Sequence, residues 1–416
     1  MRFIKTDDPF RRSAREFLRY LGPGILITVG FIDPGNWASN MAAGADYGYL
    51  LLWMVTLSTI MLINLQHNAA HVGIVTGDCM SEAAVRHLPH PFAILLIVSA
   101  MFAAGATALA ELLGGALALS MLFGMPILPG AFLTALLCGF LLWSNSYKRL
   151  ERIIIGFVSL IGISFLIEIG MVDVDWGKAV AGWVTPSFPT GSLPVIASVL
   201  GAVVMPHNLF LHSEIIQSRE WNLEDEAGIR RHLRYEFFDT LFSMGIGWAI
   251  NSAMILIAAV VFFSNGLPVT DLAQAVDMLR PLLGPAAAAI FAIALLLSGF
   301  ASTMTAGMAG GTIFSALFNE SYDIDDNHTR AGVGLTYVLA LIFLCFVTDP
   351  FQGLLYSQMA LSMQLPFTIW LLFYLTSSRK VMGKYVNNTM RKGMLAVIGI
   401  FVTVLNVMLL HEMLFG

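Results

Sequence analysis

The sequence predicts an all-α polytopic membrane protein with eleven transmembrane helices. Of its 416 residues, 57% are hydrophobic and 12% are charged, whereas a soluble domain carries about 25% charged residues. The mean hydropathy is +0.77. Apolar stretches near the length that crosses a bilayer, about 20 residues, recur along the chain. This composition leaves no room for a soluble catalytic domain, so we do not expect an enzyme.

These apolar stretches define the expected organisation. Residues 1–21 are basic and polar and lack a small-residue cleavage pattern, which is typical of a cytoplasmic leader rather than a signal peptide. The segment 264–284 is long enough for a short external helix. The expected spans are 22–46, 49–71, 92–121, 128–146, 152–172, 193–218, 234–263, 285–317, 331–348, 351–377 and 393–415.

The basic residues predict the orientation of the chain. With the N-terminus inside, 20 of the 22 Lys and Arg residues fall in cytoplasmic segments, and only Lys178 and Arg280 fall outside. Positive charge collects on the cytoplasmic side of membrane proteins. We therefore expect a cytoplasmic N-terminus and an extracytoplasmic C-terminus in the cytoplasmic membrane.

Two helix-breaking motifs occupy matching places in the two halves. Asp33-Pro34-Gly35-Asn36 interrupts the first span, and Met205-Pro206-His207-Asn208 interrupts the sixth. Five spans precede the second break, so a repeat of five must be inverted in the membrane. The sequence predicts a 5+5 inverted repeat, 22–172 and 193–377, with discontinuous helices 1 and 6, and an extra helix at 393–415. Paired breaks of this kind indicate the substrate site of a transporter.

The first break places an acid inside the membrane. Pro34 has no N–H, so the carbonyl of Gly30 loses its helical donor, and Gly35 lets the chain leave helical angles. We expect one half-helix to end near Ile32 and the next to begin near Asn36, with Asp33 between them. An unpaired carboxylate at this depth is costly, so Asp33 calls for a cation, a proton or a basic partner. A protonated Asp, or one that caps the second half-helix, is the alternative.

The second break adds a soft ligand. Pro206 frees the carbonyl of Ala202, which can serve as an oxygen ligand. Met205 offers a thioether beside the break, although methionines in apolar helices are usually core residues. A carboxylate and an amide opposite a thioether suit a transition metal better than Mg²⁺ or an organic solute.

Three further residues indicate a proton route. His207 follows Met205, and we favour a proton or gating role over metal ligation for it. Glu111 lies within the third span and should pair with His207 or Arg219, or carry a proton. Arg219 ends the sixth span and could equally reach the interface as a snorkelling side chain.

Other polar residues of the spans and loops are less specific. Gln358 in the tenth span could join the metal ligands, and helix–helix hydrogen bonding is an equally good interpretation. His67 and His71 stand four residues apart, with no third ligand nearby in the sequence. The loop 319–330 is acidic and fits a solvated turn better than a metal exit funnel.

The two motifs resemble a known family. Gly22-Pro23-Gly24 and Asp33-Pro34-Gly35-Asn36 look like the first span of Nramp (natural resistance-associated macrophage protein) divalent-metal transporters. The run from Ala202 to Arg219 resembles that family's sixth span, and the match covers nearly the whole chain. The resemblance implies the fold of the sodium-coupled amino-acid symporters. It also implies uptake of Mn²⁺ and Fe²⁺, and of Cd²⁺ and Co²⁺, with proton co-transport.

The resemblance also implies roles for single residues. Asp33, Asn36, Met205 and the Ala202 carbonyl correspond to metal ligands, with Gln358 joining in some states, and His207, Glu111 and Arg219 fit a proton network. Two positions depart from the family. Many members have an Asp where this chain has Ala108, and an Arg in the stretch that holds His71. The first departure predicts loosened or rerouted proton coupling.

The function expected is import of a divalent transition metal by alternating access. The metal is the substrate, and no cofactor is expected. The expected partners are metal ions, protons and the lipid bilayer, without nucleic acid, and we expect a monomer. Two rivals remain, a sodium-coupled organic-solute symporter of the same fold and a passive metal channel.

Overall fold

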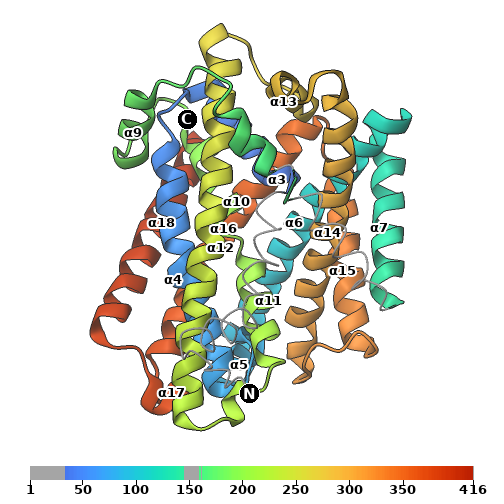
Figure 1. Ribbon diagram of the computed structural model, residues 1–416. Helices are drawn as coiled ribbons and strands as arrows, with labels where there is room; N and C mark the ends of the chain where they lie inside the picture. The colour runs from blue at the N-terminus through green and yellow to red at the C-terminus, as the bar shows by residue number, and fades with distance from the viewer. Residues whose placement is uncertain (1–32, 145–158, 161, 416) are drawn as a thin grey trace, which may run out of the picture.

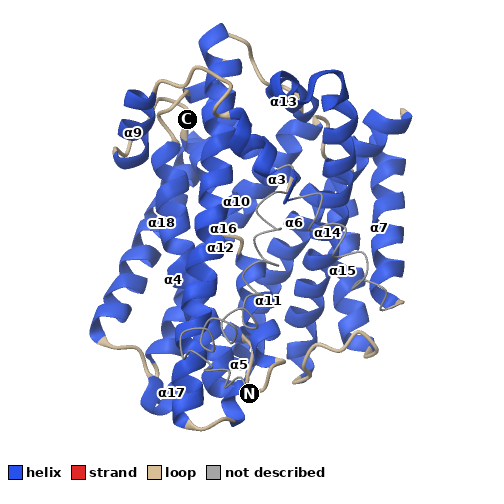
Figure 2. Ribbon diagram, in the orientation of Figure 1, coloured by secondary structure: helices blue, strands red, loops and turns tan. Residues whose placement is uncertain are grey.

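The computed structural model describes residues 33–144, 159–160 and 162–415. This part of the chain is helical and contains no strand (Figure 2). Helices at the predicted spans are α3 (Pro34–Tyr47), α4 (Leu52–Thr76), α6 (His90–Phe123), α7 (Ile127–Trp143), α10 (Leu193–Val203), α11 (Pro206–Gln217), α12 (Glu226–Val261), α14 (Ala287–Ser315), α15 (Asn327–Leu344), α16 (Pro350–Ser377) and α18 (Thr389–Phe415).

Shorter helices lie between the long ones. They are α5 (Met80–His87), α9 (Trp176–Val184), α13 (Ala275–Leu283) and α17 (Arg379–Met382). The helix expected within 264–284 is therefore confirmed as α13. The predicted leader, the start of the first span with its Gly22-Pro23-Gly24 run, the basic residues 148–152 and the start of the fifth span lie outside the described residues.

Six segments of the described chain are long and apolar enough to cross a membrane. They contain α6, α10 with α11, α12, α14, α16 and α18, while α7 is apolar but shorter. Large apolar side chains point outward on these helices, among them Phe140 and Val407, which are more than half exposed. Outward-facing apolar side chains suit a lipid environment. The count of eleven spans and the inverted repeat stay predictions.

The break in the sixth span is confirmed. Helix α10 ends at Val203, and α11 begins at Pro206 with Met205 as its N-cap. Proline is favoured at the first helical position because its missing N–H would have no partner there. Helix α3 begins in the same way at Pro34. The second half of the first span thus starts two residues before the expected Asn36.

The long helices stand side by side, and α6 and α16 lie at the centre of the packing (Figure 1). Helix α14 packs closely along α6, because Gly299 brings its backbone against Glu111 and Gly115. Helix α16 contacts α3, α6 and α10. Both helix breaks are therefore surrounded by helices from other parts of the sequence.

Candidate metal site

Asp33 caps the N-terminus of α3 with both carboxylate oxygens. Oδ1 accepts a hydrogen bond from the Asn36 backbone N–H at 2.6 Å, and Oδ2 accepts one from Asn36 Nδ2 at 2.9 Å. An aspartate N-cap satisfies helix N–H groups that have no partner within the helix. The capping alternative is therefore what the structure shows. Capping leaves lone pairs on both oxygens, so it is compatible with a ligand role.

The orientation of Asn36 leaves its own oxygen without a donor. Its Nδ2 is directed to Asp33, and its Oδ1 is buried with no hydrogen-bond partner among the described residues. The Oε1 atom of Gln358 is likewise buried and without a partner. Buried acceptors are almost always satisfied in native proteins, so two such oxygens close to a carboxylate need an explanation.

Gln358 lies close to a glycine at each of the two helix breaks. A Cβ atom on Gly35 would lie 2.0 Å from Gln358 Nε2, and one on Gly201 would lie 1.9 Å from the Gln358 backbone oxygen. Ser39 of α3 and Ser198 of α10 also share a hydrogen bond of 2.7 Å. The structure therefore brings together the start of α3, the end of α10 and the middle of α16. Asp33 and Asn36 are at the start of α3, and Gln358 is in the middle of α16.

Ala202 and Met205 lie at the second break. Ala202 is next to the C-terminus of α10, where carbonyl groups lack intrahelical donors, and Pro206 supplies no N–H to it. Met205 is 4% exposed and packs with Ala103, Ala106 and Leu361. Its sulfur also accepts a 3.1 Å hydrogen bond from Asn208 Nδ2. Leu361 lies on α16, three residues after Gln358. The role of Met205 as a ligand stays a prediction.

One face of α6 lies against both breaks. Gly114 is packed against the Pro34 ring, so that a Cβ there would meet Pro34 Cγ at 2.0 Å. Glu111, about one turn earlier, is buried, and its Oε2 has no hydrogen-bond partner among the described residues. Thr107, one turn earlier again, shares a 3.0 Å hydrogen bond with His207 Nδ1. His207 therefore contacts Thr107, and no hydrogen bond to Glu111 is found among the described residues, so of the three roles expected for Glu111 the pairing with His207 is not seen.

Arg219 lies farther from the breaks. Helix α11 has 12 residues, so it spans about 18 Å at a rise of about 1.5 Å per residue, and Arg219 follows its C-terminus. Its guanidinium lies 5.1 Å from the centre of the Trp221 ring, and the residue is exposed. A cation over an aromatic face at a helix end fits the interfacial interpretation of this arginine.

His67 has buried partners that its neighbours in the sequence do not indicate. Its Nδ1 lies 2.6 Å from Glu236 Oε2, and His212 Nε2 lies 3.4 Å from Glu236 Oε1. Thr240 donates a further hydrogen bond of 2.8 Å to that oxygen. The spacing of four residues links His67 with His71 in the sequence. The observed partner of His67, Glu236, is on α12, far away in the sequence.

The acidic loop 319–330 is an ordered turn. His328 Nδ1 lies 2.7 Å from Glu320 Oε2, and the His328 ring stacks on Phe318. Asp326 caps α15, and the N–H groups of Thr329 and His328 hold the pKa of its carboxyl below the usual value. Ligand atoms of Glu320, Asp326 and His328 lie within 4.8 Å of one another. Their hydrogen bonds already account for this arrangement as a structural turn.

The chain is similar to known proteins over nearly its whole length. The family model for natural resistance-associated macrophage protein-like sequences matches residues 24–412. A divalent metal cation transporter MntH from Caldanaerobacter subterraneus is 35% identical over 405 residues, which cover 97% of this chain and 95% of that protein. One from Listeria monocytogenes is 36% identical over 409 residues, with coverages of 95% and 90%.

Solved structures show the same fold. A manganese transporter of Eremococcus coleocola aligns with a TM-score of 0.79 and 26% identity, over 97% of this chain and 88% of that one. Mhp1, a nucleobase-cation symporter, aligns with a TM-score of 0.63 and 15% identity, over 93% of this chain and 89% of that one. The match to the family model over nearly the whole sequence, together with these relatives, shows that the chain belongs to the Nramp family.

Proposed function

We propose that this protein carries divalent transition metals, Mn²⁺ and Fe²⁺ and also Cd²⁺ and Co²⁺, into the cell through the cytoplasmic membrane. The metal is a substrate that binds between the two helix breaks and leaves on the other side by alternating access. In this proposal Asp33, Asn36, Met205 and the Ala202 carbonyl are ligands, and Gln358 joins them. The chain works as a monomer, with its N-terminus cytoplasmic and its C-terminus extracytoplasmic.

The observation that carries the proposal is the pair of unsatisfied oxygens beside a buried carboxylate. Asn36 Oδ1 and Gln358 Oε1 are buried acceptors without donors, and Gly35 places the Gln358 amide against the turn that holds Asp33. A positive ion satisfies all three groups at once, whereas an apolar solute leaves them unpaired. Carboxylate and amide oxygens suit Mn²⁺, and the Met205 thioether favours softer ions over Ca²⁺ and Mg²⁺.

The names of the relatives support the same substrate class. The curated relatives are named divalent metal cation transporters, and the solved neighbour is named a manganese transporter. Those names describe those proteins. For this chain they agree with the donor set that its own residues provide.

Proton co-transport is the second part of the proposal. Glu111 is a buried carboxyl group one turn from the Pro34 contact, and one of its oxygens has no partner among the described residues. A carboxyl group buried at this depth is costly to ionise, and this cost favours binding of a proton. Glu111 is on α6, and His207 of α11 contacts the same face of α6 at Thr107. We propose that a proton neutralises Asp33 or reaches His207, and then passes toward Glu111 and Arg219.

The test is metal uptake by purified protein in proteoliposomes that contain a pH dye. We expect Mn²⁺ uptake that saturates, needs no Na⁺ and acidifies the lumen. A dependence on Na⁺, with an organic solute as competitor, would support the symporter of organic solutes. Flux that does not saturate and does not change with pH would support a channel.

A further inference from the structure

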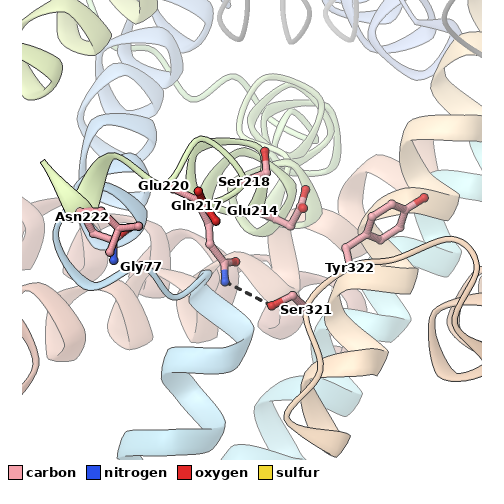
Figure 3. Close-up of a pocket in the computed structure, with 9 residues that line it drawn as sticks. Gly77, Glu214, Gln217, Ser218, Glu220, Asn222, Ser321 and Tyr322 are labelled. Atoms are coloured by element: carbon pink, nitrogen blue, oxygen red, sulfur yellow. Dashed lines mark hydrogen bonds between the residues drawn. The ribbon is translucent and has the colours of Figure 1, made fainter.

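A polar cavity of about 390 Å³ lies at the end of α11 that is far from the Met205 break. Figure 3 shows Glu214, Gln217 and Ser218 of α11 on one side, and Ser321 and Tyr322 from the segment after α14 on the other. Gly77, Glu220, Asn222 and Leu223 complete the lining. The charge pattern of the sequence predicts that this end faces the cytoplasm.

Glu214 is a carboxylate without a protein partner in this cavity. The residue is 8% exposed. No hydrogen bond or ion pair of its side chain is found among the described residues, and Figure 3 shows the Tyr322 hydroxyl directed away from it. An acidic residue that is more than nine-tenths buried, lines a cavity and has no donor calls for a positive ion or a proton there.

A second carboxylate next to the cavity already has its donors. Glu82 of α5 accepts hydrogen bonds from Gln217 Nε2 at 2.6 Å and from Ser321 Oγ at 2.7 Å. The backbone N–H of Cys79 donates to it as well, at 3.2 Å. These donors occupy both oxygens of the Glu82 carboxyl group. Gln217 and Ser321, which line the cavity, are therefore directed to Glu82 and not to Glu214.

The amide of Gln217 is oriented by this arrangement. Its nitrogen is directed to Glu82, which leaves Oε1 buried and without a hydrogen-bond partner among the described residues. Glu214 and Gln217 are three residues apart on one helix, so their side chains lie on the same face. The lining of the cavity thus combines a carboxyl group without a donor and an amide oxygen without a donor.

We infer that this cavity is a second binding site for a hydrated divalent cation, held by Glu214 and the Gln217 carbonyl oxygen. The inference rests on the proposed function. In that function the second site binds the metal on the cytoplasmic side, after the metal leaves the central site. Hard divalent ions are often bound through one or two carboxylates while they keep several waters. A cavity of about 390 Å³ has room for such an ion, because a water molecule occupies about 30 Å³.

The test counts Mn²⁺ bound to the full-length protein in lipid nanodiscs by equilibrium dialysis. The wild type should bind two ions. Glu214→Gln keeps the shape of the side chain and should lose one, or bind it at least about tenfold more weakly, which is the lower end of the loss seen for groups one shell further from a metal. Glu214→Asp should keep a weakened second site, which separates loss of a ligand from misfolding.

Glu220→Gln is the matched control. It removes the same charge from the exposed rim of the same cavity, where salt screens it, and it should still bind two ions. Equal losses in Glu220→Gln and Glu214→Gln would overturn the inference, because they would indicate a diffuse surface effect. Unchanged Mn²⁺ binding in Glu214→Gln, with altered proton uptake, would also overturn it and assign a proton to Glu214.

Asp33→Ala separates this inference from the proposed function. If both hold, this variant keeps only the cavity ion and Glu214→Gln keeps only the central one. If Asp33→Ala abolishes all binding and Glu214→Gln matches the wild type, the central site stands and the cavity site fails. If Asp33→Ala binds like the wild type while Glu214→Gln loses an ion, the central assignment fails and the cavity site stands.

Discussion

The imidazole of His67 on α4 and the carboxylate of Glu236 on α12 meet at 2.6 Å, and both residues are buried. The second oxygen of Glu236 is held by Thr240 and His212, so α4, α11 and α12 are joined at one carboxylate. Removing one member of a buried, hydrogen-bonded pair leaves the others desolvated and unpaired.

Glu236→Ala should therefore lower the free energy of unfolding by about 3–5 kcal/mol. Thermal unfolding of the detergent-solubilised protein, followed by loss of the monodisperse elution peak, measures this effect. Glu220→Ala, an exposed acid, is the control and should change little. A midpoint for Glu236→Ala equal to that of the control would show that the carboxylate does not hold these helices together.

Asp33→Ala should nearly abolish Mn²⁺ binding at the central site and with it Mn²⁺ transport. It removes the only carboxylate among the proposed ligands, and it also removes the cap of α3. Asp33→Asn separates the two roles, because an asparagine caps almost as well and carries no charge. Calorimetry of both variants with Mn²⁺ is the measurement. Unchanged affinity in Asp33→Asn would refute the assignment of this ligand.

Met205→Ala should weaken Mn²⁺ transport moderately and Cd²⁺ transport more strongly. It should also let Ca²⁺ or Mg²⁺ compete, because a thioether favours soft ions and displaces the water that hard ions prefer. Uptake of Mn²⁺ with increasing Ca²⁺ is the measurement, and Met359→Ala, at another buried methionine of the central packing, is the control. Identical Ca²⁺ competition in wild type and Met205→Ala would exclude Met205 as the selectivity element.

Two glycines that contact Gln358 should respond differently to alanine. At Gly201 the new Cβ meets the backbone oxygen of Gln358, which cannot turn aside, so Gly201→Ala should destabilise the fold by about 1–3 kcal/mol. At Gly35 the new Cβ meets the end of the Gln358 side chain, which can move. Gly35→Ala should keep stability and weaken metal binding. Thermal midpoints and Mn²⁺ affinities of both variants test this contrast, and an equal loss of stability in both would contradict it.

Glu111→Gln and His207→Ala should reduce proton entry while part of the Mn²⁺ transport remains. The membrane potential alone drives a divalent cation inward, by about 2.3 kcal/mol per charge per 100 mV, so transport does not require coupling. Ala108 replaces an acid that many family members have, which predicts loose coupling already in the wild type. Lumenal pH during Mn²⁺ uptake is the readout. If both variants acidify vesicles like the wild type, the proton follows another route.

The sequence predicted the helices best where hydropathy and proline agree. The break at Met205-Pro206 and most spans lie where expected, because proline and apolar length act locally. Helix α12 begins eight residues before its predicted start at 234, since its first turns are polar and Asp225 caps it. An Asp as N-cap with Pro at the first helical position is a typical helix start. Asp33 and Pro34 have this pattern, and it predicts the observed start of α3 at Pro34.

The parts of the sites that could not be predicted depend on distant contacts. Gln217 reaches Glu82 across 135 residues, and His67 reaches Glu236 across 169. Neither contact leaves a periodic signal in the sequence. The buried Asn36 oxygen lacks a donor because the amide nitrogen is directed to Asp33 in the folded turn, which the sequence does not show. Glu214 also gave no signal, because one acid near the end of a span is the usual pattern of an interface.

The contact of Gly201 with Gln358 has a consequence for the order of folding. Helices α10 and α11, with 11 and 12 residues, are each too short for the hydrocarbon core of about 30 Å, so the broken span depends on neighbours to shield its open backbone groups. One of these neighbours, α16, is synthesised only after α12, α14 and α15. The proposed central site should therefore form late, after most of the chain has entered the bilayer, and chains that end before α16 should be recognised and degraded by membrane quality control.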